Sequence, residues 1–153
     1  MPAGGPIEIV DLSPRRFGAV RRRSTLDAST DMATAAPVWP RILSKNVPFG
    51  LPLLVFHDAA GPELFEEPGV EIDLGFELYA DLDDPIVTMS TSPGGRAVRL
   101  DHHGPHLDIS TSHLAIRDYF AAHGLAPSGS VVEIHHWNDE PARRVTEIYY
   151  LLA

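Results

Sequence analysis

The sequence predicts an α+β domain built from two pseudo-symmetric halves, each with the order strand, strand, helix, strand, strand. Eight short segments rich in β-branched and aromatic residues, bounded by Gly, Pro, Asn or Asp, are typical of strands. Each half also holds one longer segment with helical periodicity. Several short motifs recur in the same order. We therefore expect pseudo-repeats at about 7–80 and 86–152, one domain over 7–153, and a disordered lead-in at 1–6.

In the first half, the helical pattern covers residues 31–45, with Trp39 and Ile42 near one face. Pro37 and Pro40 interrupt this pattern. Because a proline inside a helix removes a hydrogen bond and clashes with the preceding turn, we expect a kink or two short helices there. The strands expected in this half cover residues 7–11, 17–22, 53–57 and 70–79.

In the second half, Ser110 or Thr111 is expected to cap a helix that runs to His123, and Gly124 is expected to end it. The turn between the first two strands of this half contains Ser92-Pro93-Gly94-Gly95. The strands expected in this half cover residues 86–90, 96–102, 131–137 and 144–152.

The segment 131–137 carries unusual chemistry for a strand. Because successive side chains of a strand alternate between two faces, Val132 and Ile134 point to one face and Glu133, His135 and Trp137 to the other. A carboxylate, an imidazole and an indole in a row suit the wall of a partly desolvated pocket. The alternative is a half-exposed strand whose outer face carries Glu and Trp.

The internal repeat supports a cleft between the halves. A shift of 79 residues relates Gly50 to Gly129 and His57 to His136. Likewise, Phe76-Glu77-Leu78-Tyr79 resembles Thr146-Glu147-Ile148-Tyr149, and Ala19-Val20-Arg21 resembles Ala97-Val98-Arg99. We expect the apolar strand faces to pack against the helices and the mixed faces to form the cleft. Strand alternation places these residues on the mixed face: Phe56, Glu77, Tyr79, Glu133, His135, Trp137, Glu147 and Tyr149. Trp39 is a candidate for the cleft edge.

Composition excludes several classes of function. The 153 residues carry a net charge of −9 and contain no cysteine. Phosphate recognition depends on Lys and Arg, so we expect no direct nucleic-acid binding, and the basic run 21–23 is expected to be an exposed strand end. No apolar run approaches the roughly 20 residues needed to cross a bilayer, so we expect a cytoplasmic protein that does not interact with membranes. The sequence gives no indication of the oligomeric state.

We expect neither a cofactor nor a metal site. The run His102-His103-Gly104-Pro105-His106 lies in a turn and lacks the helical frame in which two histidines converge on zinc. A GxSxG nucleophile motif is also absent from the sequence.

These motifs together resemble the GyrI-like domains, which also form the effector-binding domains of bacterial multidrug-responsive regulators. The resemblance rests on His102–His106 before a helix, Gly50-Leu51-Pro52 at a strand start, the Glu133 strand and the closing Thr146–Tyr149. It covers residues 7–152 and implies a ligand cleft in which an acidic residue, here Glu133, meets cationic aromatic ligands and tyrosines such as Tyr149 stack on them. The sequence departs from the family where His106 stands in place of Tyr. No helix-turn-helix precedes the domain, so a stand-alone member is expected.

Three functions are compatible with this resemblance. The first is a binding protein that sequesters or senses small aromatic or amphipathic compounds, mainly cationic ones, through Glu133, His135, Trp137, Tyr149, Phe56, Tyr79 and Trp39. The second is a hydrolase of strained cyclopropane-bearing natural products that alkylate DNA, in which Glu133, His135 or Glu147 would act on water. The third is a protein-interaction module, such as a gyrase inhibitor, that acts through its acidic surface.

Overall fold

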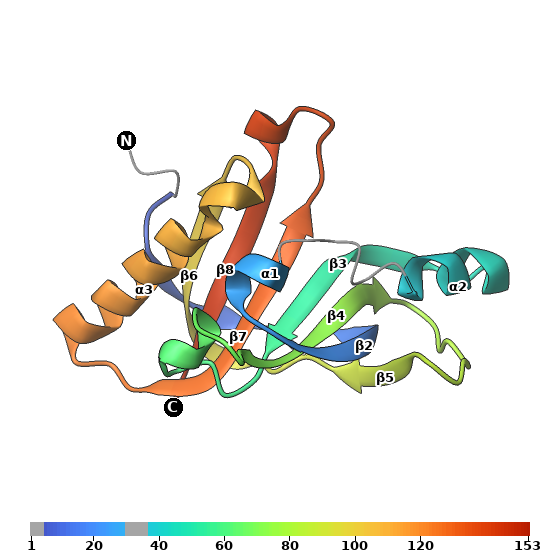
Figure 1. Ribbon diagram of the computed structural model, residues 1–153, viewed down its shortest axis with the longest axis horizontal. Coiled ribbons are helices and arrows are strands. Elements are labelled where there is room, and N and C mark those ends of the chain that lie inside the picture. The colour runs from blue at the N-terminus through green and yellow to red at the C-terminus, as the bar shows by residue number, and fades with distance from the viewer. Residues whose placement is uncertain (1–4, 30–36) are drawn as a thin grey trace.

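The computed structural model describes residues 5–29 and 37–153. Its eight strands form one antiparallel sheet in the order β1-β6-β8-β7-β3-β4-β2-β5 (Figure 1). The strands are β1 (Glu8–Leu12), β2 (Arg16–Ser24), β3 (Phe49–Phe56), β4 (Val70–Leu78), β5 (Thr88–Thr91), β6 (Gly95–His103), β7 (Pro127–His136) and β8 (Val145–Leu152). The α-helices are α1 (Leu26–Ser29), α2 (Val38–Lys45) and α3 (Ile109–His123), and the 3-10 helices are η2 (Pro62–Leu64), η3 (His106–Asp108) and η4 (Pro141–Arg143).

The strand order has two-fold pseudo-symmetry. Exchanging β1, β2, β3 and β4 with β5, β6, β7 and β8 gives the same order read from the opposite edge. The β3–β7 pair is the centre of the sheet, where Leu54 faces Glu133. The predicted α+β fold with two halves of similar topology is therefore confirmed.

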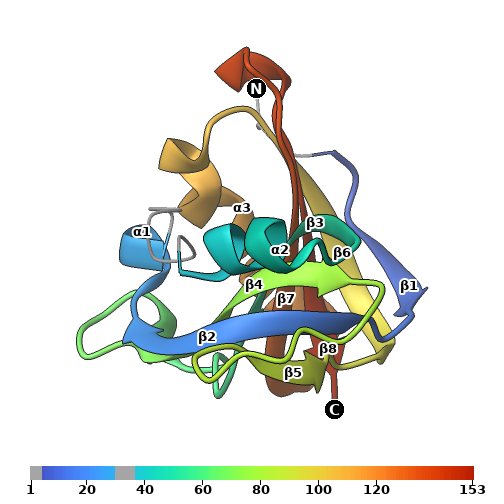
Figure 2. The same ribbon diagram turned by 90° about the vertical axis from the view of Figure 1, so that its right-hand side faces the viewer.

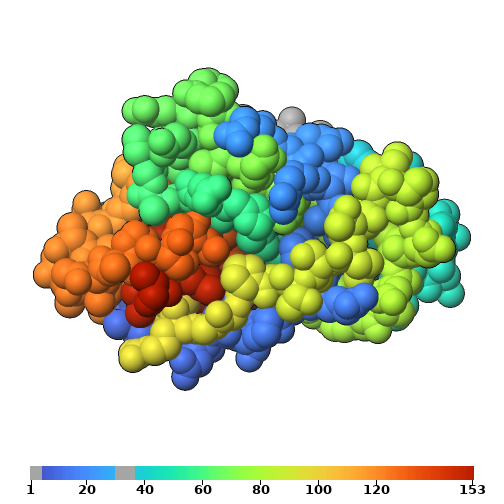
Figure 3. Space-filling view, turned by 90° about the horizontal axis from the view of Figure 1, so that it is seen from below, coloured from blue at the N-terminus to red at the C-terminus, as the bar shows by residue number. Residues whose placement is uncertain are grey.

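The first strand of each half pairs with a strand of the other half. Strand β1 pairs with β6, and β5 pairs with β2. The corners that follow these strands meet, since the Arg15 amide donates to Ser92 Oγ and the Ser92 amide donates to the Arg15 carbonyl, both at 2.8 Å. Figure 3 shows this underside, with the yellow β5–β6 segment next to blue N-terminal residues.

The three α-helices lie on one side of the sheet (Figures 1 and 2). The segment predicted as a helix at 31–45 forms α2 at its C-terminal end, while residues 30–36 lie outside the described residues. Pro40 stands in the first turn of α2, where the missing amide hydrogen has no acceptor to lose. The predicted cap of α3 by Ser110 or Thr111 is wrong, because both lie inside the helix, which begins after Asp108. Gly124 ends α3 in the left-handed region at φ 62°, as predicted.

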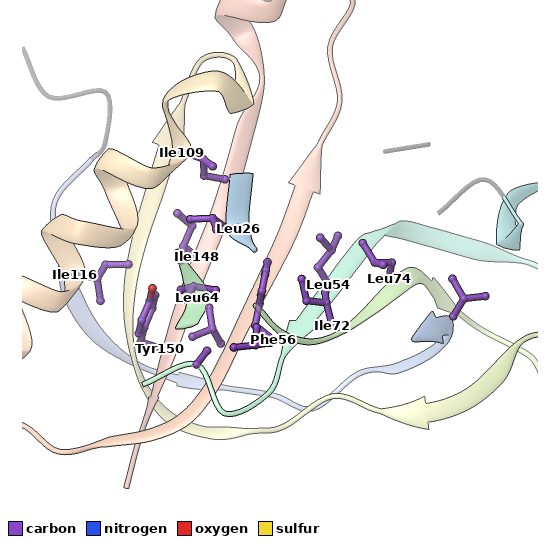
Figure 4. Packing of buried hydrophobic residues seen from close by; sticks show 14 of the residues in the cluster. Leu26, Leu54, Phe56, Leu64, Ile72, Leu74, Ile109, Ile116, Ile148 and Tyr150 are labelled. Atoms are coloured by element: carbon purple, nitrogen blue, oxygen red, sulfur yellow. The ribbon is translucent and has the colours of Figure 1, made fainter. Parts of the chain in front are cut away.

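The main hydrophobic core fills the space between the helices and the sheet. Figure 4 shows Ile109 and Ile116 of α3 and Leu26 of α1 in this layer, near Ile148 and Phe56 of the sheet. A second cluster, which includes Val132 and Ile134, lies on the opposite face. The prediction that the face with Val132 and Ile134 packs against the helices is therefore wrong. It is the face with Glu133 and His135 that the helices cover.

Several boundaries differ from the predicted ones. Strand β3 begins at Phe49 and β7 at Pro127, each four residues before the predicted start, whereas β7 ends one residue before Trp137. Of the predicted disordered lead-in, residues 1–4 lie outside the described residues, and the Gly5 amide donates to the Asp101 carbonyl at 2.9 Å. In the described part of the chain, no helix is both long and apolar enough to cross a membrane.

Candidate functional site

Glu133 is the centre of a buried polar network between α3 and the sheet. Its carboxylate is 2% exposed, on the middle strand β7. Oε2 lies 2.7 Å from Nε2 of His113, a fully buried residue of α3, and Oε1 lies 2.9 Å from Nε2 of His135, two residues further along β7. Both carboxylate oxygens therefore have a histidine partner.

This pairing fixes the protonation of the group. An ionised carboxylate only accepts hydrogen bonds, so the Nε2 atoms of His113 and His135 are the donors. Burial acts to raise the pKa of Glu133, but the hydrogen bonds from the two histidines outweigh it and hold the pKa well below its usual range. Glu133 is thus an anion at neutral pH, and each of its carboxylate oxygens is hydrogen-bonded to a histidine.

One arm of the network runs to Tyr150 and Arg117. His113 Nδ1 lies at a hydrogen-bond distance of 2.6 Å from the Tyr150 hydroxyl. Burial raises the pKa of Tyr150, and the neighbouring Arg117 partly opposes that rise. This arm therefore links the carboxylate at the sheet centre to a cation on α3.

The other arm runs to His106 and Thr146. The rings of His135 and His106 are 4.4 Å apart, and His106 Nε2 lies 2.8 Å from Thr146 Oγ1. Burial lowers the pKa of His106 to about 4, so this ring is neutral at pH 7. His135 Nδ1 is buried and has no hydrogen-bond partner in the part of the chain that the structure describes.

A small cavity of about 30 Å³ lies at this end of the network. It is lined by Pro52, His106, His135, His136, Trp137, Arg144 and Thr146. The Arg144 guanidinium lies 3.6 Å from the centroid of the Trp137 ring, and its Nε donates to the Asn138 carbonyl at 2.9 Å. Trp137 is 64% exposed and Arg144 is partly buried, so these two side chains bound the cavity on its outer side.

The structure brings together only part of the predicted site. Glu133, His135 and Trp137 lie along one stretch of β7 and its end, and Phe56 lies in the same layer, where its ring is 6.2 Å from that of His113. Phe56 is fully buried in the main core and is not part of the cavity lining beside His135.

The prediction that Glu77, Glu147 and Tyr149 share a face with Glu133 is wrong. Glu133 pairs directly with Ile148 of β8, so the neighbouring Glu147 and Tyr149 point to the opposite side of the sheet. There Tyr149 belongs to the second hydrophobic cluster, and its hydroxyl donates to Glu147. The repeat motif gave the correct strands but not their faces, since register decides the face.

Tyr79 and Trp39 lie in the other half of the molecule. Tyr79 is 65% exposed and follows the end of β4. Trp39, on α2, packs against Phe49 and Phe76 with ring centroids 5.0 and 5.3 Å away. Neither residue has a described contact with the Glu133 network.

On the side of the sheet away from the helices, the repeat extends to two histidine–carboxylate pairs. His57 Nε2 lies 2.7 Å from Asp73 Oδ2, and His136 Nε2 contacts Glu147. Each histidine is opposite the residue two positions before its acid, so the two pairs are equivalent in register. Arg21 also bonds Asp73, and this bond together with that from His57 holds the pKa of Asp73 below its usual range against the effect of burial.

Sequence reasoning did not identify His113, Thr146 or Arg144 as part of the site. His113 looks like any polar residue of a helix, and only its complete burial beside Glu133 reveals its role. His106 was visible as a departure from the family motif. In the described part of the chain, no three histidine or acidic side chains converge to hold a metal ion.

Comparisons with known proteins support the fold. No family profile and no curated protein matches the chain. The C-terminal domain of EcmrR matches with a TM-score of 0.81 at 13% identity, over 97% of each chain. SAV2435 bound to tetraphenylphosphonium matches with a TM-score of 0.64 at 11% identity, over 97% of this chain and 94% of that one. A hydrolase encoded by lin2189 from Listeria innocua matches with 0.61 at 11% identity, over 96% and 91%. The GyrI-like fold that the motifs predict is confirmed.

Proposed function

We propose that this GyrI-like chain binds small aromatic or amphipathic molecules, preferentially cations, in the cavity beside His135 and Trp137, and so sequesters or senses them. The observation that carries the proposal is the unpartnered Nδ1 of His135, buried beside a cavity that Trp137 and Arg144 close. A buried polar atom without a partner is uncommon in folded proteins, and a bound ligand would satisfy it.

The charge of the network supports the preference for cations. Glu133 is an anion, and His135, which pairs with it through Nε2, lines the cavity. A positively charged ligand group beside His135 would be attracted by this carboxylate. Arg144 already occupies the face of Trp137 as a cation, which is the position that a cationic ligand would take over.

Opening the cavity requires Arg144 to leave both the Trp137 ring and the Asn138 carbonyl. A volume of about 30 Å³ admits one water molecule and no aromatic ring. Its outer boundary is the Arg144–Trp137 stack, and a stack of this kind at an exposed site contributes about 0.5–1 kcal/mol. A ligand that stacks on Trp137 would recover this energy as it displaces Arg144.

The test uses two probes of nearly the same shape and opposite charge, tetraphenylphosphonium and tetraphenylborate. The chain has two tryptophans, so emission reports directly on Trp137 and Trp39. We expect the cation to quench emission saturably, Trp137→Phe to remove most of the quench, and the matched control Trp39→Phe to retain it. Tighter binding of the borate would contradict the charge preference. Binding of neither probe, or an unchanged quench in Trp137→Phe, would contradict the site.

The second candidate function is hydrolysis, and one observation favours it. The carboxylate of Glu133 orients His135 so that its free Nδ1 lies beside a cavity with room for one water. A histidine held in this way is suited to take a proton from attacking water. The water oxygen would bond to a carbon of a strained ring, the ring bond would break toward the substrate's conjugated carbonyl, and the proton would pass to His135.

A turnover assay separates the two functions. With a cyclopropane-bearing electrophile as substrate and mass spectrometry as readout, hydrolysis predicts that His135→Gln lowers kcat about 100-fold while affinity changes little. Absence of turnover in the wild-type chain, together with saturable binding of the cation, would leave the binding function alone.

A further inference from the structure

A second cavity lies at the opposite end of the Glu133 network, between α3, strands β7 and β8, and the loop that contains Ala60. Its volume is about 250 Å³, and it is lined by Ala60, Arg117, Phe120, Ala121, Pro127 and Tyr150. Arg117 and Tyr150 are the only members of this lining that carry a polar side chain, so most of the wall is apolar.

Arg117 is held firmly in place. Its Nη1 donates to the Ala60 carbonyl at 3.2 Å, and its Nη2 donates to the neighbouring Ala59 carbonyl. The guanidinium lies 4.8 Å from the centroid of the Phe65 ring. Two adjacent carbonyls thus bind the end of the guanidinium fork, while its planar face packs on an aromatic ring.

Within the described residues, Nε of Arg117 is buried and has no hydrogen-bond partner, although the guanidinium also interacts with the Tyr150 hydroxyl. In the ranges 5–29 and 37–153, no carboxylate forms an ion pair with Arg117. An unpaired cation is unexpected in a chain with a net charge of −9, since acidic partners are abundant.

A carboxylate is the natural complement of this arrangement. Arginine binds a carboxylate through two parallel N–H···O bonds, and Nε together with the second hydrogen of Nη2 forms one such pair of donors. The Tyr150 hydroxyl, the other polar group of the lining, also interacts with the Arg117 guanidinium. The apolar wall formed by Phe120, Ala121 and Pro127 would cover the hydrocarbon part of the ligand.

We propose that this cavity is a second ligand site, which binds a small amphipathic carboxylate through Nε and Nη2 of Arg117. The site is separate from the cavity at His135 and has the opposite charge preference. It does not depend on the function proposed for that cavity.

The test compares benzoate with the isosteric neutral benzamide by isothermal titration calorimetry of the full chain. We expect saturable binding of benzoate and at least tenfold weaker binding of benzamide. Arg117→Gln should weaken benzoate at least tenfold, and the matched control Arg96→Gln, an exposed arginine of β6, should leave its affinity unchanged. Because Arg117→Gln could also lose the carbonyl contacts and loosen the fold, Arg117→Lys serves as a second variant that keeps the charge but not the paired donors.

For Arg117→Lys we expect a loss of affinity of about fivefold to tenfold with an unchanged melting temperature. Saturating tetraphenylphosphonium should leave the benzoate affinity within a factor of two, since the two cavities do not share lining residues. Absence of saturable benzoate binding, equal affinities for benzoate and benzamide, or full affinity in Arg117→Gln would overturn the proposal.

Discussion

The substitution Glu133→Gln tests whether the buried carboxylate stabilises the fold as a charge. Gln keeps the shape of the side chain but offers one acceptor oxygen in place of two, and its amide group faces one of the two histidine donors. His135 can relieve this conflict by moving its proton to Nδ1, which has no partner, whereas the Nδ1 of His113 is engaged with Tyr150. Both hydrogen bonds can therefore be kept, but each changes from a charged to a neutral one.

A hydrogen bond to a charged group contributes about 1.5–3 kcal/mol and a neutral one about 0.5–1.5 kcal/mol, so we expect the two changes together to cost about 2 kcal/mol at pH 7. For a chain of 153 residues this corresponds to a decrease in Tm of roughly 4–8 °C. The pKa of Glu133 is lowered in the folded state, so its stabilising effect is full above the unfolded pKa of 4.5 and is lost as pH falls below that value. The difference between wild type and variant should shrink in that range.

Urea unfolding at pH 7 and at steps below pH 4.5 measures both effects. Glu140→Gln is the matched control, because the Glu140 side chain is 67% exposed and pairs only with the neighbouring Arg143, so its loss should cost less than about 0.5 kcal/mol. Replacing a buried charge with a neutral group can also stabilise a protein. If Glu133→Gln were as stable as wild type at pH 7, or if the difference were constant down to pH 3, the carboxylate would not act as described.

Three further predictions concern neighbouring groups. The pKa of His106 is lowered to about 4 from 6.5, so the free energy of unfolding should fall as pH decreases from 6.5 to 4. In His106→Gln, the free energy of unfolding measured by circular dichroism should depend less on pH in this range. Arg144→Ala removes the cation stacked on Trp137 and should strengthen tetraphenylphosphonium binding about twofold to fivefold in a fluorescence titration, whereas weaker binding would give Arg144 a direct role. A chelator such as EDTA should leave Tm unchanged in scanning calorimetry, and a decrease of several degrees would reveal a structural metal.

The topology was predictable from the sequence because each half repeats the same order of strands and helix, bounded by Gly, Pro, Asn or Asp. Gly50 and Gly129, and His57 and His136, mark equivalent strand positions before any contact is known. Strand alternation also grouped Glu133 with His135 correctly. These features depend only on local sequence, so no knowledge of tertiary contacts is needed to predict them.

The burial of Glu133 could not be predicted from its own strand. A carboxylate under a helix is tolerated only when partners from elsewhere satisfy it, and its partner His113 comes from α3, twenty residues earlier. For the same reason Val132 and Ile134 appeared to be the natural helix-facing residues, although they pack on the other side. Which face a strand turns toward the helices is decided by its pairing partners and by the layer above it.

The exchange of edge strands has a consequence for how the protein holds together. A half that contains β1, β2, β3 and β4 lacks β5 beside β2, and its own β1 lies beside β6 of the other half. Each half is therefore incomplete alone and offers an unpaired edge at β2 or β6 until the other half supplies the missing strand. We expect the halves to unfold in one cooperative transition, and two fragments divided between β4 and β5 to be individually unfolded yet to reconstitute the native sheet when mixed.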